Sequence, residues 1–186
     1  MKRYVRALGI DDAPFKPHTK GKTFLIGCVV RAPNYLEGVL RRDIEIDGRD
    51  VTEKIISMME GRFGVQVKVI MMNGVTFGGF NVADLKRIHR ETSVGIISVV
   101  RKRPDIAEIE SALKKHFSDW EDRLALMKNL PSFEYNGLFI HNVGMSEDEA
   151  KSLIKKFTVR GKMPEPIRMA HIIASGILYG ESRGKA

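Results

Sequence analysis

The middle third of the sequence alternates between strand-like and helix-like segments, and this alternation constrains the fold more than any other feature. Short apolar runs are typical of strands, and apolar residues three or four apart are typical of helices. A strand–helix–strand order implies parallel pairing with right-handed crossovers. The sequence therefore predicts an α/β fold with strands at residues 35–47, 67–72 and 94–100 and crossover helices at residues 51–60 and 82–91.

The segments on either side are expected to extend this sheet. Residues 4–12 and 23–30 are joined by short loops to each other and to the strand that follows, which is typical of an antiparallel three-stranded meander. The last third adds a strand at 137–143, a helix that begins with a capping box of Ser146 and Glu149, further helices, and a final helix at 167–178. The 186 residues are 43% hydrophobic and contain no long Pro/Gly/Ser linker. We therefore expect residues 1–186 to form a single domain, a mixed sheet with helices packed on its faces.

The first predicted strand ends at two adjacent carboxylates, Asp11 and Asp12. Carboxylates at a buried strand end are costly unless a cation shares the space, and a hard divalent metal is one such cation. Asp47, Asp50 and Glu53 cluster where the third strand turns into a helix, and they are candidate partner ligands. Two alternatives stay open. One aspartate of the pair turns the chain while the other is solvated, and Asp50 and Glu53 form a helix capping box.

A glycine-rich segment, Gly74-Val-Thr-Phe-Gly-Gly79, follows a buried strand and precedes a helix. Glycines such as Gly78 and Gly79 permit a positive φ angle or a close backbone approach to a ligand. The segment matches neither the Walker A loop nor the full dinucleotide fingerprint, which disfavours nucleotide binding by those two routes. A tight turn without a ligand is the alternative. Because α/β domains bind ligands at the carboxyl ends of strands, this segment, Asp11 and the strand end at Arg101 are expected at one site.

The formal net charge of +8 favours anionic partners such as nucleic acid, although a solvated basic surface is the alternative. If the basic clusters share one face, they would neutralise phosphates and give salt-dependent binding. The clusters are Lys16/Lys20/Lys22, Arg41/Arg42, Arg101/Lys102/Arg103, Lys155/Lys156/Arg160/Lys162 and Arg183/Lys185.

The sequence lacks the patterns typical of several other classes of protein. The single cysteine, Cys28, cannot form an intramolecular disulfide. No apolar run reaches the length of a membrane span, and the N-terminus lacks a signal-peptide core, so a cytoplasmic protein without membrane association is expected. No Cys/His pattern suggests zinc, and no serine or cysteine nucleophile set is present. His171 follows Arg168 by three residues on the last predicted helix, so the two could meet a phosphate together. A partly buried helix start after Pro166 is the alternative.

Several segments together resemble the archaeal endonuclease dU family, a distant relative of endonuclease V with a ribonuclease H-like fold. The resemblance covers nearly the whole chain. The segments that carry it are Ala7–Phe15, Gly74–Asn81, Arg101–Pro104, Pro164–His171 and Gly180–Gly184.

The resemblance also implies roles for individual residues. Gly9-Ile-Asp11 is similar to the first-strand Gly-Val-Asp of endonuclease V, whose aspartate binds metal, with Asp12 as its neighbour. A second acidic ligand is implied at the strand-to-helix junction that offers Asp47, Asp50 and Glu53. Where endonuclease V has Asp-Gly at the end of its fourth strand, this sequence has Asn73-Gly74. Asparagine is a neutral oxygen ligand, so the site would carry one negative charge less.

The activity implied by this resemblance is a Mg²⁺- or Mn²⁺-dependent endonuclease acting on DNA that contains deaminated bases, uracil foremost. Water would attack a phosphodiester in line, with Asp11, Asp12 and Asn73 as catalytic residues and Asp11, Asp50, Glu53 and Asn73 around the metal. Nucleic-acid contacts are expected from Gly78, Gly79, Arg101, Arg103, Arg168 and His171. Two rivals stay open: a nucleic-acid-binding protein that has lost catalysis, and a protein-interaction or small-ligand domain.

Overall fold

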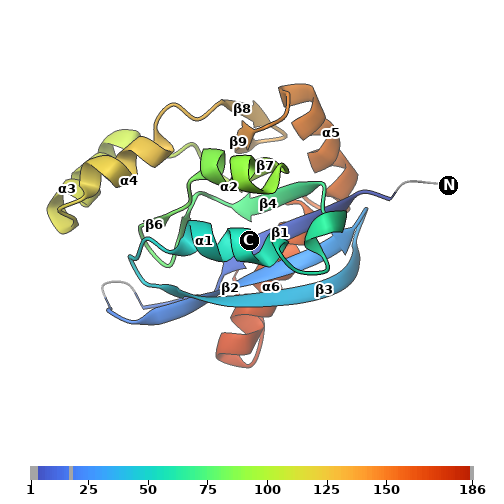
Figure 1. Ribbon diagram of the computed structural model, residues 1–186, viewed down its shortest axis with the longest axis horizontal. Helices are drawn as coiled ribbons and strands as arrows, with labels where there is room; N and C mark the ends of the chain where they lie inside the picture. The colour runs from blue at the N-terminus through green and yellow to red at the C-terminus, as the bar shows by residue number, and fades with distance from the viewer. Residues whose placement is uncertain (1–3, 17–18, 185–186) are drawn as a thin grey trace.

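A seven-stranded mixed sheet organises the computed structural model, which describes residues 4–16 and 19–184 (Figure 1). The strands lie in the order β3-β2-β1-β4-β7-β9-β8. β1, β4 and β7 run parallel to one another, and the other neighbouring pairs are antiparallel. The strand bounds are β1 Arg6–Asp12, β2 Lys22–Arg31, β3 Tyr35–Glu45, β4 Val69–Asn73, β7 Gly95–Val100, β8 Ser132–Tyr135 and β9 Leu138–Val143, with a separate ribbon of β5 Thr76–Phe77 and β6 Asn81–Val82.

Helices cover both faces of the sheet. In Figure 1, α1 and α2 lie on the near face, α6 lies behind the sheet, and α3 and α4 extend beyond one end. The helix bounds are α1 Val51–Met59, a 3₁₀ turn at Gly64–Gln66, α2 Leu85–Thr92, α3 Ile106–His116, α4 Trp120–Met127, α5 Glu147–Phe157 and α6 Glu165–Tyr179. Within the described residues, no helix is long and apolar enough to cross a membrane.

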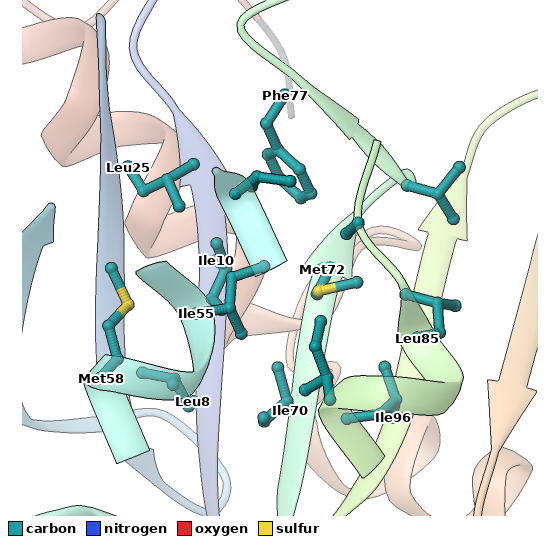
Figure 2. Close-up of a cluster of buried hydrophobic side chains, with 14 of the residues drawn as sticks. Leu8, Ile10, Leu25, Ile55, Met58, Ile70, Met72, Phe77, Leu85 and Ile96 are labelled. Carbon is teal, nitrogen blue, oxygen red and sulfur yellow. The ribbon is translucent and has the colours of Figure 1, made fainter. Parts of the chain in front are cut away.

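Alternation along the strands divides the interior into two cores, because successive side chains point to opposite faces of a sheet. On the near face, Leu8 and Ile10 of β1 pack with Ile55 of α1, Met72 of β4 and Leu85 of α2 (Figure 2). Each of these side chains is fully buried. Burial of one such side chain stabilises the fold by roughly 1.5–3 kcal/mol, so this core alone fixes α1 and α2 against the sheet.

The core of the opposite face holds α6 directly against β1. Ala170 and Ala174 of α6 are fully buried there. Gly9 of β1 permits the contact, because a Cβ atom at this position would lie 2.1 Å from the carbonyl carbon and oxygen of Pro166. A glycine inside a strand often marks such a close backbone approach. The small residues of β1 and α6 therefore set the distance between helix and sheet, and with it the position of every side chain on the inner face of α6.

The predicted sheet is confirmed in outline. The meander β1–β2–β3 is present as expected, and β4 and β7 are parallel neighbours joined by the crossover helix α2. The expected parallel pairing of β3 with β4 is wrong, because the chain crosses through α1 past β2 and β1 and β4 pairs with β1 instead. The sequence analysis missed β8 and the β5–β6 ribbon. The turn Asn136–Gly137, in which both residues have positive φ, was the available signal for the β8–β9 hairpin. Helix α6 begins at Glu165, two residues earlier than predicted, because Pro166 fits the first turn of a helix.

The two predicted capping boxes had different outcomes. The box of Ser146 and Glu149 is confirmed at the start of α5, with both reciprocal hydrogen bonds formed. The box of Asp50 and Glu53 is wrong as a hydrogen-bonding pattern. Asp50 does precede α1, but its side chain makes no cap bond to the helix.

Candidate active site

The carboxyl ends of the neighbouring parallel strands β1 and β4 bring Asp11 and Asn73 together. Ile10 pairs with Met72 in this register, so the next residues of each strand, on the α6 face, lie side by side. The Asn73 side-chain Nδ2 donates a hydrogen bond of 3.1 Å to Asp11 Oδ1. Asp11 is only 3% exposed, so its charge depends on the groups around it.

The second group on Asp11 is His171, which α6 presents to the sheet. His171 Nδ1 lies 2.8 Å from Asp11 Oδ2, and Nε2 lies 3.2 Å from the carbonyl oxygen of Arg183. Both partners accept hydrogen bonds, so both ring nitrogens carry hydrogen when the two bonds form together, as in an imidazolium. The hydrogen bond to Asp11 raises the pKa of His171, which favours the same charged form. Asp11 thus stands as a buried carboxylate between a cation and an amide.

Asp12 points to the opposite face, as strand alternation requires. Its Oδ2 accepts a 2.6 Å hydrogen bond from the backbone N–H of Gly78. Burial, followed by the nearby charge of Asp11, raises the pKa of Asp12 to about 7, although the Gly78 bond and His171 act against the shift. The adjacent pair therefore divides into two roles: Asp11 belongs to the cluster on the α6 face, and Asp12 holds the glycine-rich turn.

That turn also contains Gly79, which lies against Asp47. Gly79 has a φ of +92°, and a Cβ atom there would lie 2.2 Å from Asp47 Oδ1. The same Oδ1 accepts a 2.8 Å bond from the backbone N–H of Phe80. Gly78 and Gly79 thus permit the tight turn that joins β5 to β6, and this turn contacts Asp47 just after the end of β3.

The remaining predicted acidic ligands are engaged away from Asp11. Asp50 Oδ1 accepts bonds from Asn81 Nδ2 at 2.7 Å and from the backbone N–H of Glu45 at 3.2 Å. Glu53 pairs with Arg87 at 2.5 Å. In the part of the chain that the structure describes, no three His, Cys, Asp or Glu side chains are grouped to hold a metal ion. The structure therefore gathers Asp11, Asn73 and His171, and it leaves Asp50 and Glu53 out of that cluster.

The cluster still fits a divalent cation if the substrate completes the shell. Mg²⁺ usually keeps several waters and binds through one or two carboxylates together with substrate phosphates. The buried carboxylate of Asp11 and the side-chain oxygen of Asn73 are the oxygen donors in this cluster. They suit a cation that phosphate oxygens help to hold, not a site closed by protein ligands alone.

The predicted basic contacts are spread over two places. Arg101 and Arg103 are exposed just after β7, whose carboxyl end shares the sheet edge with those of β1 and β4. The guanidinium of Arg103 stacks over Phe139 at 5.4 Å. Arg168 forms hydrogen bonds of 2.9 and 2.6 Å to the buried Glu165. The expected pairing of Arg168 with His171 on a phosphate is thus replaced, in this structure, by separate acidic partners.

A cavity of about 800 Å³ adjoins Gly79 of the glycine turn. Phe15, Phe80 and Phe117 contribute its aromatic walls, and the rings of Phe80 and Phe117 meet edge to face with centroids 5.7 Å apart. Lys20 and Lys22 line the same cavity. It offers apolar surface for a planar group with cations beside it.

Buried Arg123 of α4 ties the walls of this cavity together, and the sequence analysis missed it. Its Nη1 donates to the carbonyl oxygens of Gly48 at 2.9 Å and Phe80 at 2.5 Å, and its Nε donates to Asp119 at 2.9 Å. The guanidinium also lies 4.3 Å from the ring centroid of Phe117. The i, i+4 spacing from Asp119 is a weak local signal for Arg123, and its other two acceptors are backbone groups distant in the chain.

Comparison with known proteins places this geometry in a family. The chain matches the model of a family described as endonuclease dU over residues 3–178. It is 44% identical over 193 residues to a UPF0215 protein from Methanothermobacter thermautotrophicus, covering 100% of this chain and 94% of the relative. It is 42% identical to a UPF0215 protein from Thermococcus kodakarensis, covering 98% of this chain and 97% of the relative.

Solved structures show the same fold. A protein from Archaeoglobus fulgidus superposes with a TM-score of 0.87 at 37% identity, covering 95% of this chain and 99% of the other. Endonuclease V from Ciona intestinalis, in complex with DNA containing an inosine, gives 0.63 at 12% identity, with coverages of 97% and 88%. Human endonuclease V gives 0.57 at 16% identity, with coverages of 93% and 84%. The fold is therefore the ribonuclease H-like fold of endonuclease V.

Proposed function

The chain belongs to the endonuclease dU family, and we propose that it is a divalent-metal-dependent endonuclease that cleaves DNA containing deaminated bases, with uracil as the foremost substrate. The observation that carries this proposal is the cluster of Asp11, Asn73 and His171 at the carboxyl edge of β1 and β4. A buried carboxylate held between an amide and an imidazolium is costly to maintain for stability alone. Such clusters are typical of functional sites.

In the proposed reaction, water attacks phosphorus and the bond to the 3′ oxygen breaks. The products are a 5′-phosphate and a 3′-hydroxyl, and the leaving oxygen takes up a proton. A bound Mg²⁺ or Mn²⁺ supplies acidification of the attacking water and neutralisation of charge on the phosphate. Asp11 and Asn73 would hold that cation. His171 donates to Asp11 from Nδ1, and it places a positive charge and a proton beside the phosphate.

The deaminated-base preference is supported by the cavity beside the glycine turn. A damaged base is more easily unstacked from a duplex, and flipped bases are held by stacking between aromatic or apolar side chains. Phe80 and Phe117 provide such surfaces in a cavity of about 800 Å³, and Asp12 links the turn beside it to the strand that carries Asp11. Base binding and cleavage would then be coupled through β1.

A second candidate is a nucleic-acid-binding protein of the same fold without catalysis. Asn73 favours it, because its amide nitrogen, and not a second carboxylate, contacts Asp11. A site with one negative charge less binds a divalent cation more weakly.

A nicking assay separates the two candidates. Uracil- and hypoxanthine-containing duplexes and an undamaged duplex of the same sequence are incubated with the full-length protein in Mg²⁺, in Mn²⁺ or in EDTA. We expect metal-dependent nicking of the damaged strands. Asp11→Ala should lower the nicking rate by about 100-fold or more, because the transition state loses the carboxylate that would hold the metal ion.

Glu134→Gln is the matched control, because Glu134 is an exposed carboxylate on β8 at the far edge of the sheet. It should nick at the wild-type rate. Nicking that survives Asp11→Ala would rule out the proposed active site. Salt-sensitive DNA binding without nicking in either metal would establish the second candidate instead.

A further inference from the structure

A second hollow, of about 620 Å³, lies where the C-terminal end of α6 meets the start of β2. We call it the lysine–tyrosine groove. The residues that define it are Lys16, Lys20, Lys22, Phe24, Leu178 and Tyr179. Among the described residues that line it, none is acidic. Its chemistry is therefore a mixture of aromatic or apolar surface and positive charge, unlike that of the buried cluster at Asp11.

The positive charge of the groove is largely uncompensated. Lys16, Lys20 and Lys22 are exposed and form no ion pair with any residue that the structure describes. Two arginines add to it from the rim, since the Arg41 guanidinium lies 4.3 Å from the Phe24 ring centroid and that of Arg183 lies 5.3 Å from the Tyr179 ring.

The two arginines at the rim already form ion pairs, whereas the Tyr179 ring is partly exposed. Arg41 and Arg183 have acidic partners outside the groove, Asp43 at 3.0 Å and Glu181 at 2.6 Å. Tyr179 is 47% exposed, although an aromatic ring normally gains by burial. The ring is thus held by a cation on one side and offers surface to a ligand.

Flexible cations next to exposed aromatic rings are the combination that binds single-stranded nucleic acid without sequence preference. Phosphates meet the lysines and unpaired bases stack on the rings. In a duplex the base faces are stacked inside the helix, so a duplex would contact the groove only through its phosphates and the lysine charges. The aromatic component of the groove therefore favours an unpaired strand over a duplex.

The position of the groove links it to the Asp11 cluster. Tyr179 lies eight residues after His171 on the same helix, which corresponds to about 12 Å at a rise of ~1.5 Å per residue. The groove also shares Phe15, Lys20 and Lys22 with the larger cavity beside the glycine turn. A strand that leaves the cluster along α6 would enter the groove within a few nucleotides.

From these observations we infer that the lysine–tyrosine groove binds a short unpaired stretch of the DNA strand that flanks the scissile phosphate. The inference rests on the proposed function for the identity of the strand. Cleavage at a damaged base would then need local strand opening next to the lesion, and the groove would hold the opened strand.

Binding in EDTA tests the groove independently of cleavage. The probes are a fluorescent oligothymidylate of about 20 nucleotides and a blunt duplex, titrated with the full-length protein by anisotropy. We expect Tyr179→Ala to weaken single-strand binding by about 10-fold, the effect of one lost stacking contact. Duplex binding should change less than about twofold, and Tyr179→Phe should bind like the wild type because it keeps the ring.

Tyr4→Ala is the matched control, because Tyr4 is also about half exposed, also stacks on an arginine, and lies before β1 at the opposite end of that strand. For the charge, Lys16→Ala should lower the slope of log affinity against log salt by about 0.7, and the exposed Lys115→Ala of α3 should not. Equal losses on single strand and duplex, or no loss with Tyr179→Ala, would overturn the inference. Anionic vesicles that compete for the groove better than the oligonucleotide would also overturn it.

A photo-crosslink connects the groove to the reaction. A 4-thiothymidine placed at successive positions beside the uracil should crosslink to the Tyr179 peptide only within a few nucleotides of the lesion. If single strands bind through Tyr179 but no nicking occurs in Mg²⁺ or Mn²⁺, the proposed endonuclease activity is rejected, while single-strand binding by the groove is kept. If Tyr179→Ala nicks at the wild-type kcat/KM, the proposed role of the groove is rejected, while the proposed endonuclease activity is kept.

Discussion

Two groups of acidic side chains lie near the ends of β1 and β3, and they differ in what satisfies them. Asp11 is held by Asn73 and His171, side chains from another strand and from α6. At the strand-to-helix corner, residues 45–53, Asp50 accepts bonds from the Glu45 backbone and the Asn81 amide, and Glu53 forms an ion pair with α2. The difference teaches that spacing alone does not identify a ligand. A carboxylate bonded to backbone and amide groups at a turn, or paired at the exposed surface, is structural, and a buried one held by an ionisable side chain from a distant element is a candidate for chemistry.

The largest expected effect comes from Gly9, which sets the distance between α6 and β1. Gly9→Ala places a Cβ atom 2.1 Å from the backbone of Pro166, so α6 must shift and His171 must leave Asp11. We expect a loss of about 3 kcal/mol in unfolding free energy, the upper range for overpacking, and loss of nicking. Chemical denaturation and the nicking assay measure the two effects.

Gly61→Ala is the control for Gly9→Ala, because no atom lies within 4 Å of a Cβ atom there and its φ is not in the left-handed region. This variant should keep wild-type stability and activity within error. A Gly9→Ala protein as stable and active as Gly61→Ala would show that the close contact of α6 with β1 does not position the cluster.

The next effect separates chemistry from stability at His171. His171→Gln removes the cation beside Asp11, and we expect kcat to fall by about 10- to 100-fold, the usual cost of losing a group that supports a metal-binding residue. Because the pKa of His171 is raised above 6.5, its stabilising bond is fully present below that pH and is lost as the pH rises through the raised value. The stability difference from the wild type should therefore be largest in acid and shrink in base.

His141→Gln serves as the matched change, because His141 lies on β9 and bonds only weakly to the Pro131 carbonyl at 3.4 Å. It should leave kcat unchanged. An equal fall in kcat for both variants, or a stability difference at His171 that grows with pH, would contradict the assignment.

For Asp50 we expect a smaller change, and one that affects stability and not activity. Asp50→Ala removes the acceptor of the Glu45 N–H and the Asn81 amide, so we expect a loss of about 1–2 kcal/mol in unfolding free energy with little change in kcat. Asp50→Asn keeps an acceptor oxygen and should be nearly wild type in both. If Asp50 were a metal ligand, Asp50→Asn would raise the Mg²⁺ concentration needed for half-maximal nicking, and that result would restore it to the site.

Only part of the fold and of the candidate site could be predicted from the sequence. The positions of the main strands, the β1–β2–β3 meander and the meeting of Asp11 with Asn73 could be predicted, because apolar periodicity marks the elements and parallel strands share one carboxyl edge. The contact of His171 with Asp11 spans 160 residues and depends on the rotation of α6 over Gly9, which no local pattern encodes. The capping-box spacing at Asp50 was matched by sequence but overridden by tertiary partners.

The last contrast lies within the aspartate pair itself. Asp12 has a pKa of about 7 in the folded protein against 3.8 in the reference state, because burial disfavours its charge. The folded state therefore binds the proton more tightly, so Asp12 makes stability fall as the pH rises from about 4 to about 7, with no further change above that.

Asp12→Asn keeps the acceptor for the Gly78 N–H and removes the titration. Measured by thermal melts in EDTA, its advantage over the wild type should grow between those two pH values and then level. Asp122→Asn, an exposed aspartate paired with Arg49, should show no such trend. An advantage for Asp12→Asn that is constant across the range would mean that Asp12 is already ionised in the fold, and that its bond to Gly78 outweighs the burial of its charge.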